Sequence, residues 1–172
     1  TNKTKAKSDI KVTAQWTTNK YELTYDDNGG SGCSTESVKK SYNSKWGTLC
    51  KPSRTGYKFV SWNTRANGTG TIITENTKVS TSNIKVYAQW SANTCTLTYN
   101  NNGGSGCSGS ISQSYSNAWG TLCKNSVREH YKFIGWNTKA DGSGTNVTDT
   151  TSTTKVCDST IYAQWTKKNY TL

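Results

Sequence analysis

The sequence predicts a tandem array of small, strand-dominated repeats of the α+β class, with at most one short helix in each repeat. Three observations support this prediction. Trp16, Trp90 and Trp165 each close a Tyr/Thr-Ala-Gln-Trp segment, and they stand 74 and 75 residues apart. Between these tryptophans, short runs of alternating apolar and polar residues are separated by glycine-rich turns. Cysteines recur at matching places in both repeats, as expected of small domains that need covalent staples.

The period divides the chain into two complete repeats with a part of another at each end. We expect residues 1–19 to hold the closing strand of a preceding repeat and a linker, and residues 166–172 to hold the first strand of a following repeat. The complete repeats are expected at 20–90 and 91–165. Residues 10–16 carry the closing-strand pattern without the rest of their domain, and such an unpaired strand invites pairing with another chain.

Each repeat is expected to begin with a β-hairpin. Tyr21, Leu23 and Tyr25 alternate with polar residues, which is the period of a half-buried strand. Asn28-Gly29-Gly30 follows and supplies the positive-φ residues that a tight turn needs. The return strand is expected at Val38 to Tyr42. The corresponding segments of the second repeat are Cys95 to Tyr99, Asn102 to Gly104 and Ile111 to Tyr115.

The second half of each repeat is expected to complete the sheet. Trp46 to Cys50 is too short to distinguish a helical turn from a loop, and we interpret it as a short helix crossing the sheet. Tyr57 to Trp62 is strongly strand-like and leads into a glycine-rich turn. The closing strand, Ile84 to Trp90, places its apolar residues on one face. Its counterparts in the second repeat are Trp119 to Cys123, Tyr131 to Trp136, and the strand ending at Trp165.

Aromatic residues must build the core, because Leu, Ile, Val and Phe together supply only 22 of the 172 residues. Such a low aliphatic content alone would raise the question of disorder. The chain nevertheless contains 7 Trp and 10 Tyr. A buried aromatic side chain removes about 150–250 Å² from water. We therefore expect one small aromatic core in each repeat.

Six cysteines allow 15 pairings in principle, but the repeat favours one. Cys33 and Cys50 correspond to Cys107 and Cys123, which predicts one bridge within each repeat, and Cys95 and Cys157 remain to pair with each other. This last bridge requires the first and last strands of the repeat to be parallel neighbours. A metal site is disfavoured, because no C-x-x-C spacing is present and the chain has one His. Disulfides place the chain outside a reducing cytoplasm.

The net charge of +11 is unevenly distributed, with +5 on residues 20–90 and +1 on residues 91–165. Basic charge beside aromatic residues raises the question of nucleic acid, but no recognisable binding signature is present. No apolar run approaches membrane length, so this segment is not expected to insert into a membrane. We expect an extracellular protein, attached to the cell surface or secreted.

Three segments of the repeat resemble those of the Listeria and Bacteroides repeat family, the B-repeat of internalin-type surface proteins. They are the opening Tyr21 to Gly30, the middle Gly56 to Trp62, and the closing Tyr-Ala-Gln-Trp. The resemblance implies a β-grasp, ubiquitin-like fold in which a mixed sheet wraps a short helix. The paired cysteines depart from the usual pattern, as does Glu129-His130, which replaces Thr55-Gly56 in the second repeat.

Trp62 and Trp136 offer the main candidate for a ligand surface. Each stands out of phase with the phenylalanine three residues before it, so strict alternation predicts that they lie on the opposite face of their strand. They either pack in a second cluster with Trp46 and Trp119, or stand partly exposed as a platform for a sugar or a partner protein. In the second case Lys45, Lys58 and Arg65 would suit an anionic glycan.

Material for catalysis is poor, and we predict no catalytic residues, cofactor or metal. His130 is the only histidine and occurs in one repeat alone, which favours a loop substitution over an acid–base role. Asp26-Asp27-Asn28 is interpreted as a turn and not a calcium loop, because its counterpart carries no carboxylate. Asn67 and Asn146 begin glycosylation sequons in what we interpret as equivalent glycine-rich turns.

These features predict a non-enzymatic, structural function. The expected role is a semi-rigid, disulfide-stapled stalk or fibre whose neighbouring repeats contact each other and present an adhesive region. The alternative is a binding module, in which the repeats contact a host glycan, a receptor or another copy of the array.

Overall fold

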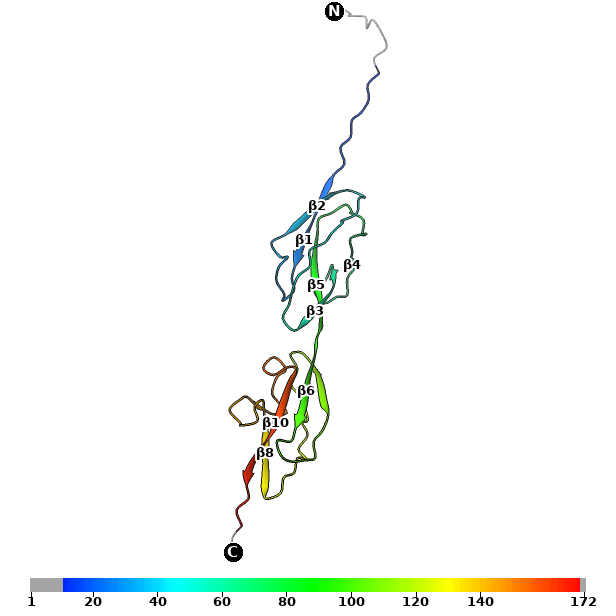
Figure 1. Ribbon diagram of the computed structural model, residues 1–172. Helices are drawn as coiled ribbons and strands as arrows, with labels where there is room; N and C mark the ends of the chain where they lie inside the picture. The colour runs from blue at the N-terminus through cyan, green and yellow to red at the C-terminus, as the bar shows by residue number, and fades with distance from the viewer. Residues whose placement is uncertain (1–10, 171–172) are drawn as a thin grey trace, which may run out of the picture.

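The computed structural model describes residues 11–170, which form two five-stranded mixed sheets placed one after the other along the chain (Figure 1). Residues 11–170 contain no helix. The strands of the first unit are β1 (Lys20–Asp26), β2 (Ser37–Ser41), β3 (Tyr57–Asn63), β4 (Ile72–Ile73) and β5 (Ile84–Ala92). Those of the second are β6 (Thr94–Asn100), β7 (Ser110–Ser114), β8 (Tyr131–Asn137), β9 (Asn146–Val147) and β10 (Ser159–Lys167).

The two sheets have the same topology. The strand order is β2-β1-β5-β3-β4 in the first unit and β7-β6-β10-β8-β9 in the second. The opening and closing strands of each unit are parallel neighbours, β1 with β5 and β6 with β10, while the other pairs are antiparallel. This is the arrangement that a bridge between Cys95 and Cys157 requires.

The prediction of a short helix between the return strand and β3 is wrong. Trp46 to Cys50 crosses the unit as irregular chain, and its amides bond to a distant segment instead of the preceding turn. Trp46 N donates to Thr77 O over 3.1 Å, and Gly47 N donates to Glu75 O over 2.9 Å. Gly47 has a φ of +75°, outside the right-handed helical region. The mixed sheet is therefore present without the helix that the family resemblance implied.

A β-bulge decides which way Trp62 and Trp136 point. In the pairing of β3 with β5, Phe59 lies opposite Trp90 and Ser61 lies opposite Gln89, so Val60 has no partner. The extra residue reverses the alternation of side chains beyond it. Phe59 and Trp62 consequently share one face, with ring centroids 5.3 Å apart. The second unit repeats this bulge at Ile134.

Each unit has its own core, built mainly from aromatic residues as expected. Trp46 and Trp62 are nearly inaccessible in the first unit, and Trp119 and Trp136 are their counterparts in the second. Aliphatic residues of the opening and closing strands complete each cluster, among them Leu23, Val86 and Ala88. The counterparts in the second unit are Leu97, Ile161 and Ala163.

The terminal strands expected from the sequence are not formed within the described residues. Residues 11–19 lie in no strand, and Trp16 is 90% exposed. A closing strand pairs with an opening strand, and the nearest opening strand, β1, is already paired with β5 on that side. Residues 168–170 also lie in no strand, while 1–10 and 171–172 fall outside the described residues. The closing strands run two residues further than predicted, to Ala92 and Lys167.

Candidate functional site

The junction between the two units is the first candidate for a functional site. The last strand of the first unit passes into the first strand of the second with only Asn93 between them. Asn93 binds both units through its backbone, because its N donates to Gly56 O over 2.9 Å and its O accepts from Tyr115 N over 2.8 Å. The linker residue is thus fixed from both sides.

Two tyrosines extend this junction. The ring of Tyr57 meets that of Tyr115 edge-on, with centroids 5.7 Å apart, and its hydroxyl donates to Ser116 Oγ over 3.0 Å. Gly56 makes the contact feasible, since a Cβ at this position would lie 2.1 Å from the Tyr115 ring. Gly56 also has a φ of +77°, which only glycine adopts without strain. Tyr115 therefore occupies space that any other residue at position 56 would fill.

Three disulfides tie the units internally: Cys33–Cys50, Cys107–Cys123 and Cys95–Cys157. All six cysteines are paired as the repeat predicts, and every bridge stays within one unit. The first two bridges join the opening hairpin to the crossing segment. Cys95–Cys157 joins β6 to the chain just before β10, so it fastens the opening strand to the closing one.

Buried tryptophans hold the crossing segment against the sheet. Trp62 Nε1 donates to Cys50 O over 2.9 Å, and Cys50 N donates to the hydroxyl of Tyr25 over 3.3 Å. Burial raises the pKa of Tyr25 above its ordinary value, and the amide of Cys50 offsets part of this effect. The second unit repeats the arrangement through Trp136 and Cys123, whose bond measures 2.7 Å.

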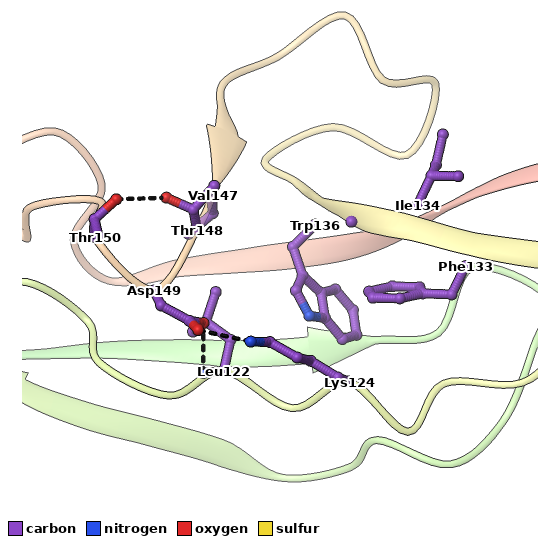
Figure 2. A pocket seen from close by; sticks show the side chains of 10 residues that line it. Leu122, Lys124, Phe133, Ile134, Trp136, Val147, Thr148, Asp149 and Thr150 are labelled. Carbon is purple, nitrogen blue, oxygen red and sulfur yellow. Dashed lines mark hydrogen bonds and ion pairs between the residues drawn. The ribbon is translucent and has the colours of Figure 1, made fainter.

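A groove of about 420 Å³ lies beside Trp136, at the part of β8 that β9 does not reach (Figure 2). Leu122, Phe133 and Ile134 contribute apolar surface to its lining. The equivalent groove of the first unit, of about 320 Å³, lies beside Trp62 and includes Leu49 and Phe59 in its lining.

An ion pair crosses the groove of the second unit. Lys124 Nζ lies 2.7 Å from Asp149 Oδ2, and Asp149 Oδ1 accepts a hydrogen bond from Leu122 N (Figure 2). Two hydrogen bonds lower the pKa of Asp149. The bond from Lys124 has the larger effect, and the bond from the Leu122 amide has the smaller one. In the first unit Lys51 and Glu75 occupy the corresponding positions. They form no ion pair within the described residues.

The structure does not support the ligand surface predicted around Trp62 and Trp136. Both side chains are packed, as the alternative interpretation held, but they lie in the main core of each unit with Trp46 or Trp119 and not in a second cluster. The two side chains are only 2% and 3% exposed, because the bulges turn them into the cores. The basic residues proposed beside them lie on separate elements. Lys45 bonds to Asn76 next to the crossing segment, Lys58 lies opposite Ser91 near the junction, and Arg65 lies in the turn after β3.

The two sequons do not occupy equivalent positions. Asn67 lies in the exposed turn after β3, where its side chain accepts hydrogen bonds from Thr69. Asn146 lies instead on the short strand β9, and its side chain accepts a bond from Asn137. The residue that corresponds to Asn67 is Asp141, which accepts the same bonds from Ser143. The predicted equivalence of the two turns is therefore wrong, although both asparagines are exposed.

Sequence reasoning missed two features. Tyr115 was assigned only to a return strand, and its contact with the preceding unit depends on how the units meet. Arg54 and Arg128 were not singled out, although each follows the crossing segment and precedes a Tyr by three residues. This pattern recurs in both repeats and could have identified the two arginines from the sequence. Their guanidinium groups lie over the rings of Tyr57 and Tyr131, 4.0 and 4.2 Å from the ring centroids.

Other candidates for chemistry remain separate in the structure. His130 has its Nε2 3.3 Å from Glu129, and both side chains are largely exposed. Within residues 11–170, no three side chains of the His, Cys, Asp and Glu types come together as metal ligands. The same part of the chain contains no helix with the length and apolar character needed to cross a membrane.

The fold and the junction define a class of protein: tandem, disulfide-stapled, strand-dominated repeats joined end to end. The model of the Listeria-Bacteroides repeat domain matches the chain twice, at residues 21–89 and 96–164. The chain belongs to this repeat family, as its three signature segments indicated.

Two curated relatives come from Evansella cellulosilytica. One, named "Putative membrane protein", is 30% identical over 166 residues and is matched over 94% of this chain. The other, named "Putative Gly-rich membrane protein", is 31% identical over 176 residues and is matched over 96% of this chain. The matches span 24% and 19% of the relatives' own lengths.

Proposed function

We propose that the chain is a segment of a semi-rigid extracellular stalk, which holds an adhesive region away from a bacterial cell surface. The observation that carries this proposal is the junction at Asn93. A single residue between two strands, bonded on both sides, leaves little freedom between the units. The end-to-end order of the sheets supports the same role (Figure 1).

The disulfides and the relatives support an extracellular location. Bridges persist in oxidising environments, and the chain has three. Two relatives carry the words "membrane protein" in their names. A stalk outside the cell also benefits from bridges that stay within each unit, since they resist unfolding without changing the junction.

We further propose that each unit is a helix-free variant of the β-grasp fold. The parallel pair of opening and closing strands at the centre of a mixed sheet supports this assignment. The irregular crossing segment, fastened by a disulfide and by Trp62 or Trp136, takes the place of the helix.

Small-angle scattering of the 172-residue chain tests the stalk. We expect an elongated particle with a narrow distribution of inter-unit angles. Tyr115→Ala removes the ring that lies against Gly56, and it should broaden this distribution while the two units remain folded. Tyr42→Ala is a matched control, because Tyr42 is the counterpart of Tyr115 in the first unit and is 50% exposed. A wild-type chain as flexible as the Tyr115 variant would refute the proposal.

A binding module is the second candidate function. It is supported by the charge difference between two units of the same fold, +5 against +1. A purely structural scaffold does not require this difference, whereas an anionic partner would favour the first unit.

A further inference from the structure

We propose that a hollow beside Arg54 in the first unit binds an oxyanion carried by an acidic polysaccharide, a sulfate or a carboxylate. The hollow, of about 390 Å³, lies between the turn after β1 and the chain before β3. Its lining residues include Gly29, Ser31, Ser53 and Thr55 as well as Arg54. The proposal goes beyond the stalk role and does not depend on it.

The guanidinium of Arg54 lies over an aromatic ring and close to the glycine turn that follows β1. One face lies over the ring of Tyr57, 4.0 Å from its centroid. On the turn, a Cβ at Gly29 would lie 3.3 Å from the guanidinium carbon, so the absence of a side chain there admits the group. Because the group is already oriented, a ligand would lose little side-chain entropy on binding it.

Most donors in this hollow have no acceptor within the protein. The Arg54 guanidinium makes one hydrogen bond within the described residues, from Nη1 to Asn28 O at 3.4 Å, and has no carboxylate partner there. The side-chain hydroxyls of Ser31, Ser53 and Thr55 make no hydrogen bond in the described part of the chain, and neither does the Gly29 amide. Guanidinium, hydroxyl and amide donors together suit the oxygens of a sulfate or carboxylate.

The turn that carries Gly29 is anchored. Gly30 N donates to Asp27 O over 2.9 Å, and the side chain of Asn28 donates to the carbonyls of Ala66 and Ala88. Ser31 and Ser53 exchange two backbone hydrogen bonds of 2.9 Å each. The donors around the hollow therefore keep fixed positions, which favours binding of a ligand of matching shape.

The second unit provides an internal comparison. Arg128 lies over Tyr131 and donates to Asn102 O over 3.4 Å, as its counterpart does in the first unit. Two of the hydroxyl positions have changed, however, because Val127 replaces Ser53 and Glu129 replaces Thr55. The Glu129 carboxylate lies beside His130, in the residue next to Arg128, and its negative charge repels an anion that approaches the arginine. We expect the second unit to bind the same oxyanion much more weakly.

Titration of the full chain with dextran sulfate and polygalacturonate, at low and high salt, tests the site. Neutral dextran is the uncharged control. Binding should weaken with salt, as for any charged ligand, and the amide resonances of Gly29 and Arg54 should shift. Binding to dextran sulfate alone assigns the site to sulfate, and binding to polygalacturonate alone assigns it to carboxylate. Either result, or both, supports the proposal, and binding to neither polymer overturns it.

Three variants distinguish binding at the hollow beside Arg54 from non-specific attraction to a basic protein. Arg54→Gln should weaken binding about tenfold, because it removes charge-assisted hydrogen bonds. Arg65→Gln and Arg128→Gln remove the same charge elsewhere and should change affinity less than about twofold. Equal losses in all three variants would overturn the proposal.

A second variant keeps Arg54 in place. Thr55→Glu introduces the carboxylate of the second unit and should weaken binding to the level of that unit, whereas Glu129→Thr should strengthen the weak site. Amide spectra of each variant verify that both units remain folded. Full binding by the Thr55→Glu chain would also overturn the proposal. Scattering of the same variants should show an unchanged particle, so failure of this site is distinguishable from failure of the stalk.

Discussion

The two units share one sheet topology but differ in how the opening strand is fastened to the closing one. In the second unit a disulfide joins Cys95 to Cys157. In the first unit Tyr21 and Ser82 stand at these positions. Both units keep a weaker tie, in which Asn83 or Asp158 accepts a hydrogen bond from the opening strand. The first unit forms the same sheet without this bridge, so the additional disulfide of the second unit adds stability to a topology that does not require it.

A second difference lies at the end of the unit where a neighbour attaches. Gly56 leaves room for Tyr115 of the second unit, whereas its counterpart His130 has a side chain at the same kind of position, with a φ of +64°. His130 O still accepts a hydrogen bond from Lys168 N, as Gly56 O does from Asn93 N. The backbone hydrogen bond to the chain that leaves each unit is thus preserved, while the side chain at this position differs.

Removing the central tryptophan should have the largest effect and should separate the two units. Trp62→Ala and Trp136→Ala each delete a buried ring and should cost about 3–5 kcal/mol of unfolding free energy. We expect the first unit to unfold in the Trp62→Ala chain. The second unit should stay folded in the Trp136→Ala chain, because its additional disulfide stabilises it. Amide exchange measured unit by unit checks this, and equal survival of both units would contradict it.

Replacing Cys95 and Cys157 by Ser should bring the second unit down to the stability of the first. The bridge closes a loop across 62 residues, which corresponds to about 4 kcal/mol on the chain-entropy model. Thermal unfolding should then show two units that melt together. The paired Cys107→Ser and Cys123→Ser variant is a control with a shorter loop, for which we expect about 3 kcal/mol.

Gly56→His transfers the residue of the second unit into the junction. A Cβ at this position would lie 2.1 Å from the Tyr115 ring, and the positive φ adds about 1 kcal/mol of strain. We expect loss of the contact between Tyr57 and Tyr115, visible as broader inter-unit angles in scattering. The reverse variant, His130→Gly, relieves the strain of a positive φ but adds the conformational entropy of glycine to the unfolded state, so stability should stay within about 0.5 kcal/mol.

Acid should have the smallest effect and should act on both units alike. Bonds from Lys85 and from the Asn28 amide lower the pKa of Asp26, and Lys124 and the Leu122 amide do the same for Asp149. Because the folded state holds these pKa values below 3.8, the stabilisation is present above that pH and is lost as pH falls through the lowered values.

Urea unfolding at neutral pH and below pH 3.8 measures this loss. Asp26→Asn and Asp149→Asn should each flatten the pH dependence of one unit. Both carboxylates are partly exposed and their ion pairs are screened by solvent, so the change should be small. A steeper loss in only one unit would show that another carboxylate dominates there.

Repetition explains why much of the fold could be predicted. Recurring patterns gave the two units, four of the five strands in each unit and the three bridges, and Cys95 with Cys157 indicated that the opening and closing strands are parallel neighbours. The short strands β4 and β9 were not predicted. The crossing segment could not be predicted, because Trp46 and Gly47 bond to Thr77 and Glu75, about thirty positions further along the chain. Local sequence does not contain that partner.

The face of β3 on which Trp62 lies could not be predicted from the local sequence either. Strict alternation placed it opposite Phe59, but the bulge at Val60 returns both rings to one face. A bulge depends on pairing with β5, so it is invisible in the β3 segment alone. The donors around Arg54 were likewise missed, since they come from two segments that meet only in the folded unit.

The sequence by itself determined the number of units, the cysteine pairing and the aromatic composition of the core, because these follow from a pattern that is written twice. Tertiary structure alone decided the path of the crossing segment, the direction of the tryptophans and the fit of Tyr115 against Gly56. The physical reason is that these features depend on hydrogen bonds and contacts between residues far apart in the chain, and the geometry of such contacts exists only after the strands have paired.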